Sequence, residues 1–354
     1  MNILITGNMG YVGPALIRHL RATIPSARLV GFDSGYFAEC LTGTSQPPEK
    51  QLDEQHIGDV RNFPTRILTN TDAIIHLAAI SNDPMGQTFE AVTHEINHLA
   101  TIQLAQRAKA SGVRSFIFAS SCSAYGFAED GARTEMSTLQ PLTAYAKSKV
   151  CTETALQQLA APHFTITCLR FGTACGMSDR LRLDLVLNDF VASAIATRWV
   201  QVLSDGTAWR PLIHVSDMAR AFEWALQRTP SNGGDLLVVN TGTNTWNYQV
   251  KALAEAVARF IPGTEVSINK HAQPDKRSYR VDFSLFRRLA PEYQPRTTLE
   301  NAIFELRDGL TAMAFNDADF RNSKLIRLQM LLLLRSRGQL NEELRWRKAT
   351  TSTA

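Results

Sequence analysis

The sequence lacks the features that mark secreted, membrane-spanning and thiolate-metal proteins. Its 354 residues hold only five cysteines, an odd number without a Cys-x-x-Cys pair. We therefore expect reduced thiols in a cytoplasmic protein. The N-terminus enters an apolar run at once, so no signal peptide is expected. The apolar stretch 330–334 is too short to span a bilayer, so no membrane partner is expected.

Charge of one sign is also scarce. Lys and Arg number 37 against 33 Asp and Glu, which gives a formal net charge of +4. No basic block stands out before the scattered basic residues near the C-terminal end. This balance suits anionic small molecules and argues against a nucleic-acid partner. A content of 44% hydrophobic and 20% charged residues is typical of a folded soluble protein.

The chain opens with the pattern of a strand, a glycine-rich turn and a helix. Residues 2–6 are apolar, and a helical pattern follows the turn. Glycines permit close backbone approach, and the N-terminus of the helix faces a pyrophosphate. The spacing is Gly-x-x-Gly-x-x-Gly, and it predicts a dinucleotide-binding turn formed by Gly7, Asn8, Met9, Gly10, Tyr11, Val12 and Gly13.

Asp33 ends the second apolar run, about twenty residues beyond the last of these glycines. A carboxylate at this point accepts hydrogen bonds from the adenosine ribose and repels a 2′-phosphate. The position therefore favours NAD over NADP, with a simple turn aspartate as the alternative.

Apolar runs alternate with helical patterns through the first half of the chain. This series predicts an α/β fold with a doubly wound parallel sheet. Ligands bind at the carboxyl ends of the strands in such sheets. Further cofactor contacts are therefore expected after the later strands, at Asp59, Val60, Leu77, Ala78, Ala79 and Ser120. His76 lies inside the fourth run and is interpreted as a buried core histidine.

The stretch His94-Glu95-Ile96-Asn97-His98 matches the zinc-protease pattern His-Glu-x-x-His. No further histidine follows over 100–110, and the stretch sits inside the alternating strand and helix pattern. We therefore predict no metal site.

Tyr145 and Lys149 are four residues apart in a run that favours helix. This spacing places a phenol and an ammonium on one helix face. A cation about 4 Å away lowers the pKa of a phenol by roughly three units at an effective dielectric near 20. The pair is therefore a candidate for taking a proton from a sugar hydroxyl.

Together, these motifs resemble the extended short-chain dehydrogenase/reductase family of nucleotide-sugar epimerases and dehydratases. The resemblance spans roughly residues 2–285 and rests on the glycine-rich turn, Asp33, 58–60, 76–79, Asn97, 120–126, Tyr145 with Lys149, 169–170 and 210–217. It implies a Rossmann-type domain over residues 1–172, with a returning segment near 212–245. A smaller α+β substrate lobe would comprise 173–211 and 246–345.

The resemblance also implies roles for single residues. Ser121, Tyr145 and Lys149 look like the catalytic trio, and Asn97 resembles a structural helix asparagine. Phe171 is expected beside the NAD cofactor, as are Tyr145 and Lys149. The substrate would be a nucleoside-diphosphate sugar, held by Ser121, Cys122, Ser123, Thr173, Arg180, Arg182, Arg210 and Arg277.

The positions after Ser121 distinguish members of the family. Dehydratases of this family carry acids there, and this chain has Cys122 and Ser123. The sequence therefore favours NAD-dependent epimerisation at C4, with a 4-keto reductase or a 4,6-dehydratase as alternatives and a non-catalytic dinucleotide sensor as a remote one. The resemblance also implies a homodimer that packs through helices near 93–111 and 143–160. The nucleotide and the sugar stay open.

Overall fold

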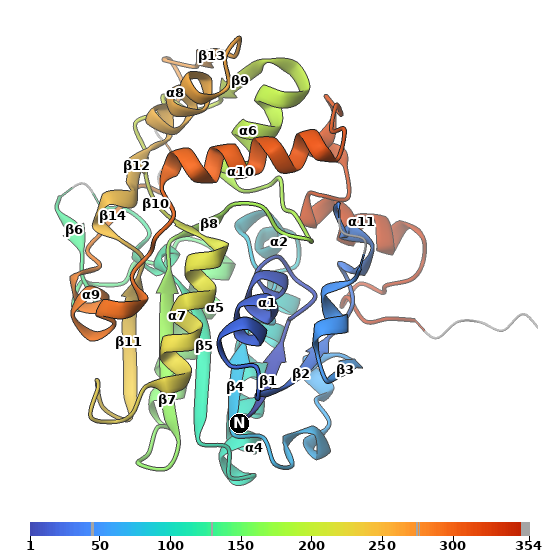
Figure 1. Ribbon diagram of the computed structural model, residues 1–354, viewed down its shortest axis with the longest axis vertical. Coiled ribbons are helices and arrows are strands. Elements are labelled where there is room, and N and C mark those ends of the chain that lie inside the picture. Colours follow the sequence, from blue (N-terminus) through green and yellow to red (C-terminus); the bar gives the residue numbers. More distant parts are fainter. Residues whose placement is uncertain (44–45, 129, 274, 276, 348–354) are drawn as a thin grey trace, which may run out of the picture.

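The computed structural model describes residues 1–43, 46–128, 130–273, 275 and 277–347. Within these residues, a sheet of seven parallel strands has the order β11-β7-β5-β4-β1-β2-β3 (Figure 1). Its strands are β1 (Asn2–Thr6), β2 (Arg28–Asp33), β3 (Glu54–Ile57), β4 (Ala73–His76), β5 (Ser115–Ser121), β7 (Thr165–Phe171) and β11 (Leu236–Thr241). The predicted doubly wound α/β fold is confirmed.

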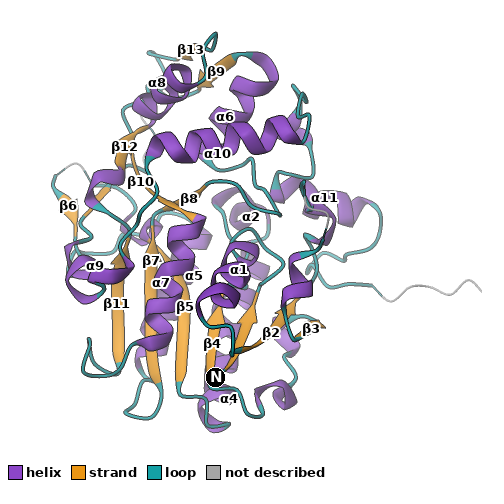
Figure 2. Cartoon of the chain, in the orientation of Figure 1, coloured by secondary structure: helices purple, strands orange, loops and turns teal. Residues whose placement is uncertain are grey.

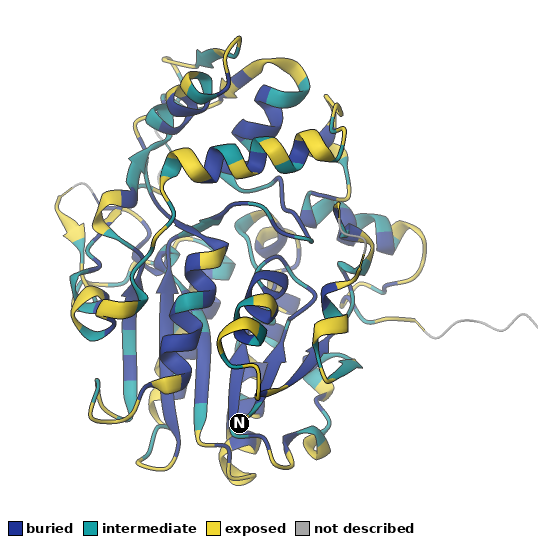
Figure 3. Ribbon diagram, viewed as in Figure 1, coloured by how far each residue is buried: buried dark blue, intermediate teal, exposed yellow. Residues whose placement is uncertain are grey.

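The strands are apolar because helices cover both faces of the sheet. Figure 3 shows the central strands buried inside an exposed outer layer, and β7 is buried along its whole length. Neighbouring side chains of a strand point to opposite faces. In β1, Ile3 and Ile5 therefore enter one core cluster and Leu4 enters the other.

One face of the sheet is covered by α1 (Gly13–Thr23) and α7 (Val215–Gln227). Pro14 stands in the first turn of α1, where a missing N–H costs nothing. The other face carries α2 (Asp83–Thr88), α3 (Glu90–His94), the π-helical segment η5 (Glu95–Ala100), α4 (Thr101–Ala110) and α5 (Ala144–Gln157). Among the described residues, none of the helices has the length and apolar character needed to cross a bilayer.

A second lobe stands at the carboxyl ends of the strands (Figure 2). Its helices are α6 (Val186–Thr197), α8 (Val250–Phe260) and α10 (Leu299–Ala312). Its strands are β8 (Thr173–Cys175), β9 (Trp199–Val202), β10 (Trp209–His214), β12 (Asn247–Gln249) and β13 (Glu265–Ile268). Beside it, β6 (Ala132–Arg133) pairs with β14 (Arg280–Val281), and α9 (Ser284–Leu289) follows.

The end of the described chain runs back to the sheet. Helix α11 (Arg327–Ser336) inserts Met330, Leu331 and Leu334 into the core cluster that lies under α2 to α5. Figure 1 shows this last helix at the right of the view, above β2 and β3, and it packs against α2. Residues 327–344 therefore pack against the domain of the seven-stranded sheet, whereas the sequence suggested that 246–345 belong to the substrate lobe.

Candidate active site

Two pockets meet at the carboxyl edge of the sheet. The first, the dinucleotide pocket, is lined from the glycine-rich turn and the ends of β2 and β4, and it includes Gly7, Gly10, Asp33, Asp59, Val60 and Ala78. The second, the catalytic cleft, lies between the sheet and the second lobe and includes Ser120, Ser121, Ser123, Tyr145, Lys149, Phe171 and Thr173. The two are continuous, because both are lined by Tyr11, Val12, Leu77, Ala79, Ser81 and Arg182.

The glycine-rich turn has no room for a side chain at Gly7 or at Gly13. Gly7 has φ +74°, and a Cβ there would lie 2.5 Å from the backbone nitrogen of Ala78. A Cβ on Gly13 would lie 1.9 Å from the backbone oxygen of Asn8. Both contacts are closer than any real Cβ makes, so the turn requires glycine at these points. The backbone can therefore approach a pyrophosphate closely, at the N-terminus of α1.

Three residues of the predicted turn do not line the dinucleotide pocket. The buried Asn8 side chain faces β3, where its Nδ2 donates to Gln55 Oε1 at 2.6 Å. The Met9 side chain is buried, while its backbone N–H donates to Asp33 Oδ2 at 2.9 Å. Gly13 is buried in the first turn of α1. Their contribution lies in shaping the turn.

Asp33 is fixed to the turn by backbone donors. Besides the bond from Met9, its Oδ1 accepts the Gly35 N–H at 2.7 Å. Burial raises the pKa of the Asp33 carboxyl, and these two hydrogen bonds act in the opposite direction. Asp59 also lines the pocket and is held by Arg61 Nη2 at 2.6 Å. The donors and acceptors present therefore fit a dinucleotide with a free ribose diol.

Ser121, Tyr145 and Lys149 meet in the catalytic cleft from two elements of the sheet domain. Ser121 ends β5, and Tyr145 lies in the first turn of α5, where Thr143 Oγ1 accepts the Ala146 N–H at 3.1 Å as the N-cap. Lys149 is buried one turn further on. Its Nζ donates to Ala119 O at 2.7 Å and lies 5.6 Å from the Tyr145 ring centre.

Burial dominates the electrostatics of this pair. It raises the pKa of Tyr145 to about 12, while a hydrogen bond with Ser121 acts in the opposite direction. It lowers the pKa of Lys149 to about 7, although the Glu153 carboxylate opposes this. The expectation that the Lys149 ammonium depresses the pKa of Tyr145 in the protein alone is therefore wrong, because desolvation is the larger effect for both groups.

Asn97 and a buried ion pair hold this part of the site. Asn97 Oδ1 accepts the Ile80 N–H at 2.8 Å, and its Nδ2 donates to Ser148 Oγ at 3.0 Å. It therefore ties the exit of β4 to the helix that carries Tyr145. One turn beyond Lys149, Glu153 accepts Ser120 Oγ at 2.5 Å and pairs with the buried Arg170 at 2.5 Å.

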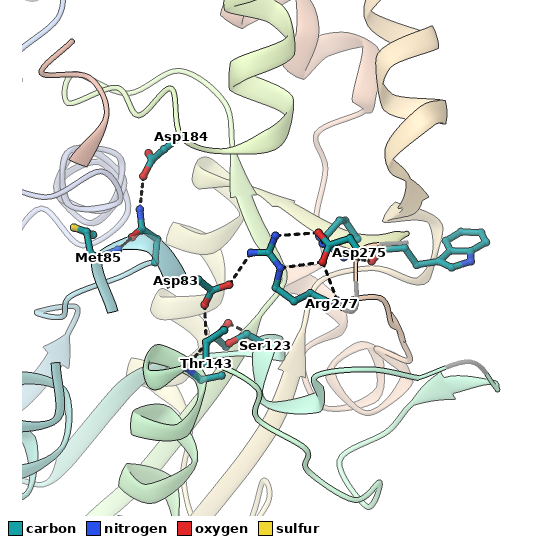
Figure 4. A network of polar contacts seen from close by, with 12 residues as sticks. Asp83, Met85, Ser123, Thr143, Asp184, Asp275 and Arg277 are labelled. Carbon is teal, nitrogen blue, oxygen red and sulfur yellow. Dashed lines mark hydrogen bonds and ion pairs between the residues drawn. The ribbon is translucent and has the colours of Figure 1, made fainter. Parts of the chain in front are cut away.

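The predicted diphosphate ligands lie in the cleft but are already paired with acids (Figure 4). Arg277 Nη1 donates to Asp83 Oδ2 at 2.9 Å, and its Nη2 donates to Asp275 Oδ2 at 2.9 Å. Arg210 Nη2 donates to the same Asp275 oxygen at 2.6 Å. On the other side, Asp83 Oδ1 accepts Thr143 Oγ1 at 2.7 Å. The network therefore connects the second lobe to the N-cap of α5.

Three other predicted substrate ligands lie differently. Cys122 does not line the cleft, because its buried Sγ donates to Arg170 O at 3.1 Å. Arg180 does not line it either, since its guanidinium is 1% exposed and pairs with Glu49 at 2.6 Å. Arg182 lines both pockets and pairs with Asp184 at 2.9 Å.

The histidines that the sequence analysis considered line neither pocket. His76 is buried, and its two ring nitrogens lie 2.7 Å from Thr6 Oγ1 and 2.8 Å from Thr101 Oγ1, which confirms the core interpretation. The rings of His94 and His98 are 5.1 Å apart on the helix surface. In the part of the chain that the structure describes, no group of three or more His, Cys, Asp or Glu side chains is placed to hold a metal ion.

The sequence did not single out several residues that line the site. Asp83 and Ser81 follow β4 closely, and the run Asn82-Asp83-Pro84 carries the marks of a helix start, so this signal was available. Asp275 and Arg327 carried no such signal, because they lie in irregular or distant parts of the chain.

A parallel doubly wound sheet, a glycine-rich turn and a Ser/Tyr/Lys group in one cleft define a dinucleotide-dependent enzyme. Residues 3–242 match the model of the NAD dependent epimerase/dehydratase family, which is more than half of the chain. The chain belongs to this family, and its cofactor is NAD.

Relatives and solved structures agree with this assignment. The UDP-glucose 4-epimerase of Streptomyces lividans is 26% identical over 276 residues, covering 72% of this chain and 80% of that protein. The dTDP-glucose 4,6-dehydratase of Streptomyces griseus is 24% identical over 294 residues, covering 81% and 87%. MoeE5 in complex with UDP-glucuronic acid and NAD has the same fold, with a TM-score of 0.75, 24% identity and coverage of 88% and 99%.

Proposed function

We propose that the protein is an NAD-dependent epimerase that inverts C4 of a nucleoside-diphosphate sugar through a transient 4-keto sugar. The observation that carries the proposal is the catalytic trio, with no additional free acid among the described residues that line the cleft. Ser121 is followed by Cys122, which faces away from the cleft, and by Ser123. The described acids of the cleft, Asp83, Asp184, Asp189 and Asp275, are each paired with an arginine. Elimination of water would need an acid that is free to donate a proton.

The chain's own residues act on the sugar 4-hydroxyl. Tyr145 takes its proton, and Ser121 donates a hydrogen bond to the same oxygen. Lys149 adds a positive charge one helix turn away, since part of it is protonated at neutral pH with a pKa of about 7. When bound, NAD supplies the hydride acceptor and the hydride donor, as well as a cationic ring that favours the phenolate.

Arg210 and Arg277 are suited to the diphosphate of the substrate. Both line the catalytic cleft and present guanidinium groups that share the single carboxylate of Asp275. Phosphate oxygens accept two parallel N–H bonds from such a group. A diphosphate would therefore replace the carboxylate contacts of both side chains, and Thr173 would contact the sugar from β8.

We further propose a homodimer that forms through α3, η5, α4 and α5. Leu99 is 45% exposed on η5, and Ile102 is only half-buried on α4, so apolar side chains lie on this surface. Light scattering at micromolar concentration should give the mass of two chains, and Leu99→Glu should shift it toward one chain. A wild-type monomer would contradict this proposal.

The cysteines support a place in the cytoplasm. All five are free, and Cys151 is the exposed one. An exposed thiol is preserved in a reducing compartment and is prone to oxidation elsewhere. Expression of a tagged copy followed by fractionation tests this placement.

The test of the main proposal uses a panel of UDP-, GDP-, CDP- and dTDP-sugars with the protein and bound NAD. Proton NMR should show inversion at C4 without added NADPH. A product lighter by one water would indicate a dehydratase, and turnover that requires added NADPH would indicate a keto-sugar reductase. Either outcome would overturn the proposed epimerisation.

A further inference from the structure

The last helix brings a buried arginine into the wall of the dinucleotide pocket. Arg327 is the first residue of α11, and it lines this pocket although it is only 1% exposed. Its Nη2 donates to Arg180 O at 2.6 Å, and its guanidinium carbon lies 4.6 Å from the Phe37 ring centre. Among the described residues, its Nη1 has no hydrogen-bond partner.

The guanidinium of Arg327 also differs from its neighbours in having no carboxylate partner among the described residues. The neighbouring Arg180 pairs with Glu49 at 2.6 Å, and Arg182 pairs with Asp184 at 2.9 Å. Arg327 forms no ion pair with any carboxylate in the described part of the chain, and a buried unpaired charge is destabilising. Burial lowers the pKa of Arg327 to about 10, so the side chain is still charged at neutral pH.

A dinucleotide would supply the missing charge. The same pocket is lined by Gly7, Gly10 and Val12 of the turn at the N-terminus of α1, which attracts a pyrophosphate. Arg182 lines the pocket too, but its charge is already matched by Asp184. Arg327 is therefore the unmatched cation of this pocket among the described residues.

We propose that Arg327 donates a hydrogen bond from Nη1 to the pyrophosphate of the bound dinucleotide, so that the C-terminal segment forms part of the cofactor site. This proposal rests on the NAD dependence of the family and not on the chemistry at the sugar. It concerns a part of the chain beyond residues 3–242, which carry the family match.

The end of the described chain is fastened to the pocket wall. Leu344 O accepts the Tyr36 hydroxyl, and Ser34 O accepts Trp346 Nε1 at 2.6 Å. Ser34 and Tyr36 themselves line the dinucleotide pocket. Arg61 Nη1 adds a bond to Glu343 O at 2.7 Å. These contacts hold the segment against the loop after β2, which keeps Arg327 in place.

The test compares Arg327→Gln with Arg337→Gln as the matched control. Arg337 lies on the same segment but is half exposed and makes a surface pair with Glu39. Protein stripped of nucleotide is titrated by calorimetry with NAD, NADP, ADP-ribose and adenosine. For Arg327→Gln, the Kd of NAD and of ADP-ribose should rise about 10- to 100-fold, since hydrogen bonds to charged groups are the stronger ones. Adenosine, which has no phosphate, should be affected less than about threefold, and Arg337→Gln should match the wild type.

Arg327→Lys separates a lost contact from a damaged fold. It keeps the charge and should recover part of the affinity for ADP-ribose, with a thermal midpoint close to that of Arg327→Gln. An equal loss for adenosine and ADP-ribose would show a structural role and overturn the proposal. A loss confined to NADP would place Arg327 at the 2′ position and overturn the pyrophosphate assignment. These titrations are decided without any sugar, so they stand or fall separately from C4 epimerisation.

Discussion

The dinucleotide half and the catalytic cleft are stabilised by charges in different ways. In the dinucleotide half, Asp59 pairs with Arg61 two positions away, and Asp33 accepts the N–H of Gly35, also two positions away, and that of Met9 in the glycine-rich turn. In the cleft, Arg277 reaches Asp83, a residue 194 positions distant. The contacts of Asp59 with Arg61 and of Asp33 with Gly35 follow from local backbone geometry, and the contact of Arg277 with Asp83 appears only when distant segments pack. The proposed substrate ligands Arg210 and Arg277 make no contact with the glycine-rich turn among the hydrogen bonds described above, so they can change without disturbing it.

Tyr145 lies where the two regions meet, and it provides the largest expected effect. Tyr145→Phe removes the proton acceptor but keeps the ring, so turnover of the nucleotide sugar should fall about 10²- to 10⁴-fold. The NAD content of the purified protein should stay unchanged, because the hydroxyl borders the cleft and not the dinucleotide pocket. Activity is followed by NMR and NAD content by absorbance after denaturation. Unchanged turnover would favour a non-catalytic dinucleotide sensor.

A substitution of Lys149 tests whether burial of this lysine lowers the free energy of unfolding. The pKa of Lys149 is lowered to about 7 in the folded protein, so the unfolded chain binds more protons between that value and its ordinary pKa. The unfavourable contribution is fully present below pH about 7, and stability rises with pH up to about 10. Lys149→Met should therefore stabilise the fold by roughly 2–4 kcal/mol near neutral pH, after allowance for the lost bond to Ala119 O, and by little near pH 10.

Urea unfolding at the two pH values measures this difference. Lys147→Met, which changes an exposed lysine of the same helix, should alter the free energy of unfolding by less than about 0.5 kcal/mol at both. A Lys149→Met variant that is less stable than the wild type at neutral pH would show that packing, rather than desolvation, controls this position.

The sequence predicted what depends on local pattern. The strands, the glycine turn and the helix that carries Tyr145 and Lys149 follow from apolar runs, backbone space and a run that favours helix. The direction of Cys122 was less accessible, since it depends on how the chain turns after β5 into a short 3₁₀ helix. The partner of Arg180 was not accessible at all, because Glu49 lies 131 positions away in a loop. Desolvation of Lys149 likewise requires knowledge of what covers it.

A substitution of Arg277 tests the contact between segments that are distant in the sequence. Arg277→Ala should raise the KM for the nucleotide sugar about 10- to 100-fold with a small change in kcat, because a diphosphate contact far from the reacting carbon binds the ground state and the transition state alike. Arg287→Ala on α9, which is exposed and outside the cleft, is the control. Steady-state kinetics with the substrate found in the panel separates the two parameters. A fall in kcat at constant KM would mean that Arg277 acts through Asp83 and the N-cap of α5 instead.

A substitution of Asp33 tests the cofactor site and has the smallest expected effect. Asp33→Asn keeps the size of the side chain but puts an amide N–H against one of two backbone donors, the N–H groups of Met9 and Gly35. The affinity for NAD should fall about tenfold, and the affinity for NADP should rise because the repulsive charge is gone. Calorimetric titration with both cofactors gives the ratio. If the ratio of the NAD and NADP affinities stays constant in Asp33→Asn but changes in Arg327→Gln, the choice between NAD and NADP depends on the C-terminal segment. The cofactor site would then depend on a contact between distant segments, as the catalytic cleft does.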